Sequence, residues 1–234
     1  MLADQFGGGD EQVSLDVAEG EFVCLLGASG CGKSTLLNLI VGLYRVSAGT
    51  IDVGGRRVAL MFQEPALFPW LTARENVEMG MRFRGIGAAE RGATARGLLR
   101  LVHLEAFAER RPHQLSGGMR QRVAIARALA QEADVLLMDE PFGALDAMTR
   151  DVLHDELEAI WSRTALTVLF VTHNVREAVR LGDRVVLLSS RPGRVVAEFP
   201  IDLPRPRQGD SVAVAELTAG ITERLRAEVR RHGR

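Results

Sequence analysis

Residues 27–34 read Gly27-Ala28-Ser29-Gly30-Cys31-Gly32-Lys33-Ser34, and this stretch decides the fold of the chain. It matches the pattern Gly-x-x-x-x-Gly-Lys-[Ser/Thr], a loop whose backbone N–H groups cradle phosphates. The apolar run at residues 21–26 predicts a buried strand before the loop, and residues 34–43 predict a helix after it. This context makes the pattern specific, because the helix N-terminus adds its positive dipole to the phosphate site.

Lys33 is the only lysine in the 234 residues, and the other 28 of the 29 Lys and Arg residues are arginines. A compact ammonium fits between the β- and γ-phosphates, where the broad planar fork of arginine is a poor substitute. The lone lysine therefore favours a phosphate-binding role over an accident of composition. In the same pattern the Ser34 hydroxyl binds Mg²⁺, and Cys31 is expected to contribute its backbone rather than its thiol.

Length and composition bound the class of protein. A chain of 234 residues is long enough for one large α/β domain with a subdomain, or for two small domains. The net charge of −1 gives no electrostatic footprint for nucleic acid. The two cysteines, Cys24 and Cys31, suggest no disulfide framework, so we expect a reducing compartment. We expect neither a signal peptide nor a membrane span, since residues 1–10 are glycine-rich and acidic and no stretch of 18 apolar residues occurs.

Short apolar runs alternate with helical patterns, as in an α/β fold with a mostly parallel, buried sheet flanked by helices. The runs lie at residues 58–62, 135–138, 167–171 and 185–188, and a half-exposed strand is predicted around residues 13–17. The pattern between residues 62 and 135 is helical. We therefore predict one domain over residues 1–234, with a helical subdomain inserted at residues 64–115. A proline-broken segment introduces a C-terminal extension at residues 203–234, with a helix over 214–231.

A second anion-binding pattern lies at residues 115–121, Leu-Ser-Gly-Gly-Met-Arg-Gln, directly before a strong helical run. Ser116 is a good N-cap, and Gly117 and Gly118 expose backbone N–H groups at the helix start. The alternative interpretation is a plain capped helix. The residue types alone leave both open.

Two acids end the apolar run at residues 135–138, namely Asp139 and Glu140. A carboxylate at a strand end beside a phosphate-binding loop holds Mg²⁺, directly or through water, and the next acid can polarise the attacking water. The alternative is a solvated strand end, which is common for a single acid and less so for a pair in this place.

These motifs together resemble the nucleotide-binding subunit of an ABC transporter, over nearly the whole chain. They occur in the family's order: the loop at residues 27–34, Gln63, the pattern at residues 115–121, Asp139-Glu140-Pro141, Gly143-Ala144-Leu145-Asp146 and His173. The phosphate-binding loop alone would leave many families open. The resemblance implies a P-loop NTPase core with a small antiparallel β subdomain and an inserted helical subdomain.

The resemblance also implies a role for each motif residue. The residues that would wrap the phosphates are Gly27, Ala28, Ser29, Gly30, Cys31, Gly32, Lys33, Ser34 and Thr35. Gln63 would reach Mg²⁺ and the attacking water, and Asp139 and Ser34 would support Mg²⁺. Glu140 would be the general base, and His173 would contact the γ-phosphate. Without the other motifs, His173 would be interpreted as a polar helix cap.

In this family two copies sandwich two ATP molecules head to tail. Ser116, Gly117 and Gly118 would then cap the γ-phosphate held by the other copy, and Asp146 would lie at that interface. The implied cofactors are ATP and Mg²⁺. The implied partners are a second copy, integral membrane permease subunits and, indirectly, a solute-binding protein, with no nucleic acid. The subunit would sit peripherally on the cytoplasmic face of the inner membrane and be soluble when isolated.

A finer resemblance points to the importers of nitrate, sulfonate and taurine. It rests on residues 65–72, Pro-Ala-Leu-Phe-Pro-Trp-Leu-Thr, and on the tail at residues 191–207. An apolar cluster follows Gln63 and consists of Leu67, Phe68, Trp70 and Leu71. This cluster either packs inside the helical subdomain or forms a groove for a helix of the membrane subunit, and both can hold.

The chain departs from the family pattern at two places. Phe6 is the best candidate for the aromatic residue that stacks on adenine, but only five residues precede it, so the family's preceding strand is expected to be mostly absent. The segment 51–58 is short, with a tight turn at Gly54-Gly55.

Other classes explain the sequence less well. A soluble ABC-type ATPase acting on DNA or ribosomes would carry a long coiled-coil insertion or a second cassette. A P-loop small-molecule kinase would leave residues 115–121 unexplained. A non-hydrolysing binding subunit would not need Lys33, Asp139 and Glu140.

Overall fold

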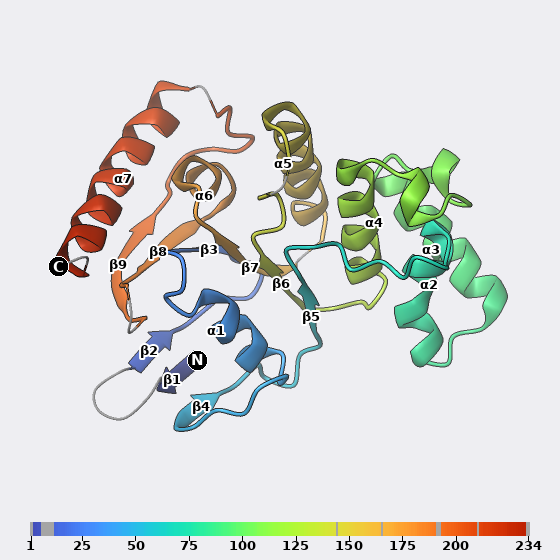
Figure 1. The fold of residues 1–234 in the computed structure, drawn as a ribbon, viewed down its shortest axis with the longest axis horizontal. Helices are drawn as coiled ribbons and strands as arrows, with labels where there is room; N and C mark the ends of the chain where they lie inside the picture. The colour runs from blue at the N-terminus through green and yellow to red at the C-terminus, as the bar shows by residue number, and fades with distance from the viewer. Residues whose placement is uncertain are drawn as a thin grey trace.

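The computed structural model describes residues 2–5, 12–143, 145–164, 166–190, 193–209 and 211–232. Phe6 lies outside these residues. The main sheet has the strand order β5-β6-β7-β3-β8-β9 (Figure 1). Its strands are β3 (Phe22–Leu26), β5 (Val58–Met61), β6 (Val135–Asp139), β7 (Thr167–Thr172), β8 (Arg184–Leu188) and β9 (Val195–Pro200). The first five pair in parallel, and β9 pairs antiparallel with β8.

Alternate side chains of the strands fill two separate cores. On β3, Phe22 and Cys24 face the large core, whereas Val23 and Leu25 face the small core. The small core also holds Leu36, Leu37 and Ile40 of α1 (Lys33–Ile40), together with Val13 and Leu15 of β2 (Gln12–Leu15). The large core extends into α5 (Ala147–Trp161), α6 (Val175–Leu181) and the helices that lie between β5 and β6 in the sequence. Burial on both faces explains why these strands read as continuous apolar runs.

A three-stranded antiparallel sheet, β2-β1-β4, lies beside the main sheet. Here β1 spans Leu2–Gln5 and pairs with both β2 and β4 (Gly49–Ile51). The expectation that the strand before position 6 is mostly absent is therefore wrong. The chain from β4 to β5 turns at Gly54 and Gly55, with φ of 61° and 70°, which is the left-handed region that glycine adopts at little cost.

The helical layer contains α2 (Ala73–Phe83), α3 (Ala88–Leu101), two 3₁₀ turns (η1, Glu105–Phe107, and η2, Pro112–Gln114) and α4 (Gly117–Leu129). In Figure 1 these helices lie together beyond β5, away from α1. The start of α2 is fixed by a capping box, since Thr72 accepts from the Glu75 backbone and the Glu75 carboxylate accepts from the Thr72 backbone.

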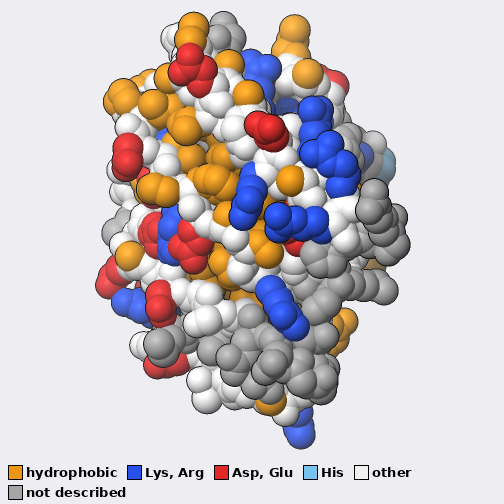
Figure 2. Space-filling model, turned by 90° about the vertical axis from the view of Figure 1, so that its left-hand side faces the viewer, with side chains coloured by type: hydrophobic (Ala, Val, Ile, Leu, Met, Phe, Trp, Pro, Cys, Tyr) orange, Lys and Arg blue, Asp and Glu red, His pale blue; other side chains and the backbone are white. Residues whose placement is uncertain are grey.

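The end of the chain crosses back over α6. The segment after β9 leads into α7 (Val212–His232), whose Val214 and Ile221 complete the large core. Figure 2, viewed from the side of α7, shows hydrophobic side chains across the middle of this face with charged groups around them. No helix in the described ranges is both long enough and apolar enough to cross a membrane.

Candidate functional site

The loop at residues 27–32 joins β3 to α1 and is shaped by glycines. Gly30 and Gly32 have φ of 78° and 102°, a left-handed conformation that other residues rarely adopt. Gly32 is the N-cap of α1, and no side chain caps the helix there. The first N–H groups of α1 therefore remain available for an anion.

The Lys33 ammonium lies inside this loop. Its Nζ donates to the carbonyl oxygens of Gly27 at 2.8 Å and Ala28 at 3.1 Å, and the residue is 5% exposed. Cys31 is buried in the small core, and its Sγ would lie 2.8 Å from a Cβ at Gly27. The loop is thus closely packed on itself, and the Lys33 ammonium lies among its carbonyl oxygens.

Asp139 and Ser34 meet beside this loop. The Ser34 hydroxyl hydrogen-bonds to the Asp139 carboxylate, and burial raises the pKa of that carboxyl above its ordinary value. The negative charge of Glu140 raises this pKa further, whereas the Ser34 hydrogen bond and the Lys33 charge lower it. The described residues contain no cluster of three or more His, Cys, Asp and Glu side chains suited to a metal. The two oxygen ligands suit Mg²⁺, which binds one or two protein groups and takes its other ligands from phosphates and water.

Glu140, His173 and Gln63 meet next to Asp139. His173 Nδ1 lies 2.8 Å from Glu140 Oε2, and the His173 side chain is 62% exposed. A Cβ at Gly143 would lie 3.7 Å from Gln63 Nε2 and 3.8 Å from Glu140 Oε2, which places both side chains around one point. Glu140 has φ of 42°, and such a conformation at a non-glycine residue is typical of functional sites.

Sheet order explains this convergence. Gln63 follows β5, Glu140 follows β6, His173 follows β7, and the phosphate-binding loop follows β3. These four strands are consecutive neighbours and run parallel, so their carboxyl ends share one edge. Ligands of open α/β sheets bind at this edge.

The segment at residues 115–121 begins α4. Ser116 caps the helix by accepting from the Met119 backbone at 3.2 Å. A Cβ on Gly118 would lie 2.5 Å from Thr149 Cγ2, so α4 and α5 approach closely at this glycine. Asp146 caps α5 by accepting from the Thr149 backbone and hydroxyl at 2.9 and 2.7 Å, and these hydrogen bonds lower its pKa.

Sequence reasoning missed the residues that hold these segments in place. Gln121 donates to the Pro141 carbonyl and fastens α4 to the segment after Glu140. Arg150 donates to the carbonyls of Phe142 at 3.3 Å and Leu145 at 2.7 Å. No local pattern distinguishes these polar side chains from surface residues, since their partners lie 5 to 20 positions away.

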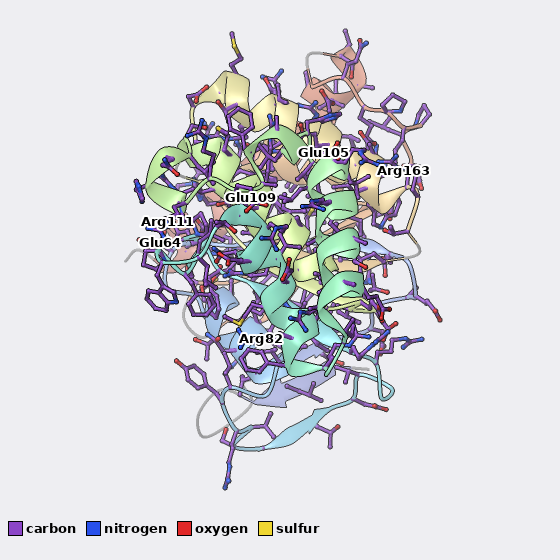
Figure 3. The ribbon with its side chains drawn as sticks, turned by 90° about the vertical axis from the view of Figure 1, so that its right-hand side faces the viewer. Glu64, Arg82, Glu105, Glu109, Arg111 and Arg163 are labelled. Atoms are coloured by element: carbon purple, nitrogen blue, oxygen red, sulfur yellow. The ribbon has the colours of Figure 1, made fainter. Side chains whose placement is uncertain are left out.

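Residues 65–72 are held by two side chains from α2 and α4. Asn76 is fully buried and donates to the carbonyls of Phe68 and Thr72, and Arg127 donates to those of Pro65 and Ala66. The Phe68 and Trp70 rings lie 5.6 Å apart, and Trp70 is 66% exposed. Figure 3 views the molecule from the side of the helical layer, where the labelled side chains Glu64, Glu109 and Arg111 lie near one another in the view and Arg82 lies in the last turn of α2.

The comparison with known proteins decides the family. The model described as "ABC transporter" matches residues 11–143, more than half of the chain. This chain belongs to the ABC transporter family. It is an ATP-hydrolysing, ATP-binding subunit of the importer type.

Among similar proteins is the taurine import ATP-binding protein TauB of Rhizobium johnstonii, 49% identical over 93% of this ABC subunit and 87% of the relative. The nitrate import ATP-binding protein NrtD of Synechocystis is 50% identical over 83% and 76%. Among solved structures, the ATP-binding cassette MJ0796, a dimer bound to ADP and Pi, is 34% identical with a TM-score of 0.71. That match covers 86% of this chain and 97% of the cassette.

Proposed function

We propose that this ABC subunit hydrolyses ATP with Mg²⁺ in a head-to-tail dimer and drives uptake of a small nitrate-, sulfonate- or taurine-type solute through separate permease subunits. The observation that carries the catalytic part is the contact of Glu140 and His173 at 2.8 Å beside Gln63 and the Asp139–Ser34 pair. The solute class rests on the relatives, which are named as taurine and nitrate import proteins.

In this proposal the polar groups of the site have different tasks. Lys33 and the backbone N–H groups from Gly27 to Thr35 bind the phosphates. Ser34 and Asp139 would hold Mg²⁺, which would supply positive charge beside the phosphates. Glu140 accepts the proton of the attacking water. His173 orients the Glu140 carboxylate and contacts the γ-phosphate, and Gln63 positions the water.

The second copy completes each site in this proposal. Ser116, Gly117 and Gly118 would face the γ-phosphate of the partner, with Asp146 at the interface. The dimeric form of the related cassette supports this arrangement. Mixing Ser116→Arg with Lys33→Ala tests it, because a mixed dimer has one intact composite site and should regain part of the ATPase activity. Mixed dimers without any recovery would contradict sharing of the site.

The docking of a permease is proposed at residues 65–72. Asn76 and Arg127 immobilise this segment while Trp70 stays exposed, as a rigid receiving surface requires. The test of the transport function is uptake of labelled taurine and nitrate by vesicles that carry this subunit together with its permease subunits. ATP-dependent uptake of either solute is the expected result. ATP hydrolysis without uptake of either would overturn the proposed solute class.

A further inference from the structure

A chain of buried polar groups runs behind the catalytic residues, from the middle of α5 to the end of β7. His154 on α5 is 3% exposed, and its Nε2 lies 2.6 Å from Oε1 of Glu177 on α6. Glu177 is 5% exposed. Its second oxygen accepts a hydrogen bond from the Thr172 hydroxyl at the end of β7. None of these three residues belongs to a motif that sequence analysis recognises.

At one end of this series of polar groups, hydrogen bonds hold the residues on both sides of His173 in the sequence. Thr172 directly precedes His173, and the Thr172 hydroxyl oxygen also accepts from the Asn174 backbone at 3.0 Å. The Asn174 side chain in turn caps α6 by accepting from Arg176 and Glu177. The backbone on either side of His173 is thus fixed through Glu177 and Thr172.

At the other end of the series, His154 contacts the segment that carries Glu140. The Phe142 ring packs edge-on against the His154 ring, with centroids 5.2 Å apart and an interplanar angle of 69°. Phe142 is 1% exposed and lies between Glu140 and Gly143 in the sequence. The His154 imidazole therefore contacts Phe142, two residues after Glu140, and Glu177, which is hydrogen-bonded to the residue before His173.

The neighbours of His154 assign its proton. His154 Nδ1 lies 3.4 Å from an Arg180 nitrogen, and that guanidinium is held at 2.7 Å by both Asp151 and Asp155. A guanidinium only donates, so Nδ1 accepts. The ring proton is consequently on Nε2 and is donated to Glu177, which gives the buried carboxylate a partner.

We propose that His154 is a positioning residue for ATP hydrolysis. Through Glu177 and Thr172 it fixes the segment that carries His173, and through Phe142 it supports the segment that carries Glu140. It thereby maintains the 2.8 Å contact between His173 and Glu140. This inference rests on the proposed roles of Glu140 and His173.

The first test replaces His154 by Phe and by Gln. His154→Phe keeps a ring against Phe142 but leaves Oε1 of Glu177 without its imidazole partner. His154→Gln can still donate to Glu177 and accept from Arg180. We expect kcat for ATP hydrolysis to fall about 10- to 100-fold in His154→Phe, as a small misplacement of catalytic groups does, and to recover mostly in His154→Gln. The Kd for Mg-ATP should stay within about twofold, because the phosphate-binding loop lies on other elements. His113→Phe, at an exposed histidine, is the matched control.

A second variant serves where His154→Phe fails to fold. Thr172→Val keeps the side-chain shape and removes the hydroxyl that joins Glu177 to the His173 segment, with Thr222→Val on α7 as its control. The same fall in kcat at unchanged Kd is expected. Unchanged kcat in either folded variant would overturn the inference. So would a parallel loss of ATP affinity, because that outcome indicates general damage to the fold.

His173→Ala, measured in parallel, separates this inference from the proposed function. If His173→Ala retains full ATPase activity, the proposed role of His173 is wrong. If His173→Ala loses activity while the His154 and Thr172 variants do not, the proposed role stands and only the positioning inference fails.

Discussion

The phosphate-binding loop and the Glu140–His173 pocket are built in opposite ways. Lys33 donates to Gly27 and Ala28, six and five residues away, so the loop forms its contacts within itself. Glu140 and His173 are 33 residues apart, and Gln63 comes from a third segment. One half of the site is local, and the other exists only once β5, β6 and β7 are neighbours. A defect of the fold should therefore lower the rate of ATP hydrolysis before it weakens the binding of the phosphates.

The largest expected effect is on ATP turnover and comes from the Glu140–His173 pocket. Glu140→Gln removes the proposed base but keeps the size and the polarity of the side chain, so turnover should fall about 10²- to 10⁴-fold while ATP binding persists. Phosphate release and size-exclusion chromatography with Mg-ATP measure this, and the mutant should accumulate as an ATP-bound dimer. Glu216→Gln, exposed on α7, is the control. Near wild-type hydrolysis would remove Glu140 from the role of base.

A substitution in the phosphate-binding loop should weaken ATP binding and not only slow turnover. Lys33→Ala removes one charged donor to the phosphates, worth about 1.5–3 kcal/mol, so the Kd for Mg-ATP should rise about 10- to 100-fold. Calorimetric titration with Mg-ATP checks this, with Arg226→Ala on α7 as the control. An unchanged Kd would show that the buried ammonium does not contact the nucleotide.

The packing of the two halves also differs. A Cβ at Gly27 would lie 2.8 Å from Cys31 Sγ and 3.3 Å from Leu188, whereas the nearest atom to a Cβ at Gly143 is the Glu140 carbonyl oxygen at 3.5 Å. Gly27→Ala should therefore destabilise the fold by about 1–3 kcal/mol. Gly143→Ala should leave the unfolding free energy nearly unchanged. Urea unfolding measures both, and partial recovery in Gly27→Ala/Cys31→Ala would identify the sulfur as the clashing atom. Equal stability of the two single variants would contradict this contrast.

The smallest effect concerns another locally encoded feature, the capping box of α2. Thr72→Ala should cost about 1 kcal/mol, the usual worth of an N-cap. Hydrogen bonds from the Thr72 backbone and hydroxyl lower the pKa of Glu75. The stabilisation by Glu75 is thus present above its unfolded-state pKa and is lost as the pH falls through the lower folded-state value. Thr72→Ala removes the hydroxyl bond to the Glu75 carboxylate and keeps the backbone bond. Unfolding at pH 7 and at pH 3 should therefore show a smaller cost of Thr72→Ala in acid, and a cost independent of pH would show that the hydroxyl does not stabilise this carboxylate.

The same distinction explains what could be predicted from sequence. The loop, its flanking strand and helix, and the buried strands were predictable, because neighbouring residues encode them. The edge strand β9 was not predicted, since its residues are half-exposed and need β8 as a pairing partner. The strand β1 was expected to be mostly absent because only five residues precede Phe6, yet its four residues suffice to pair with β2 and β4.

The candidate site follows the same rule. The acids at the end of β6 and the histidine after β7 could be named from their motifs, but their contact depends on strand order. His154 lacks any motif, and its importance arises only from the approach of α5 to α6.

The burial of Lys33 has a chemical consequence. Because this is the chain's only lysine and it is 5% exposed, arginines carry the positive charge of the surface, and no lysine amine is presented to solvent. Reagents and enzymes that acylate lysine side chains therefore have a single target, and it lies within the phosphate-binding loop. The rate at which that amine reacts therefore measures how often the loop opens, free of background from any other lysine.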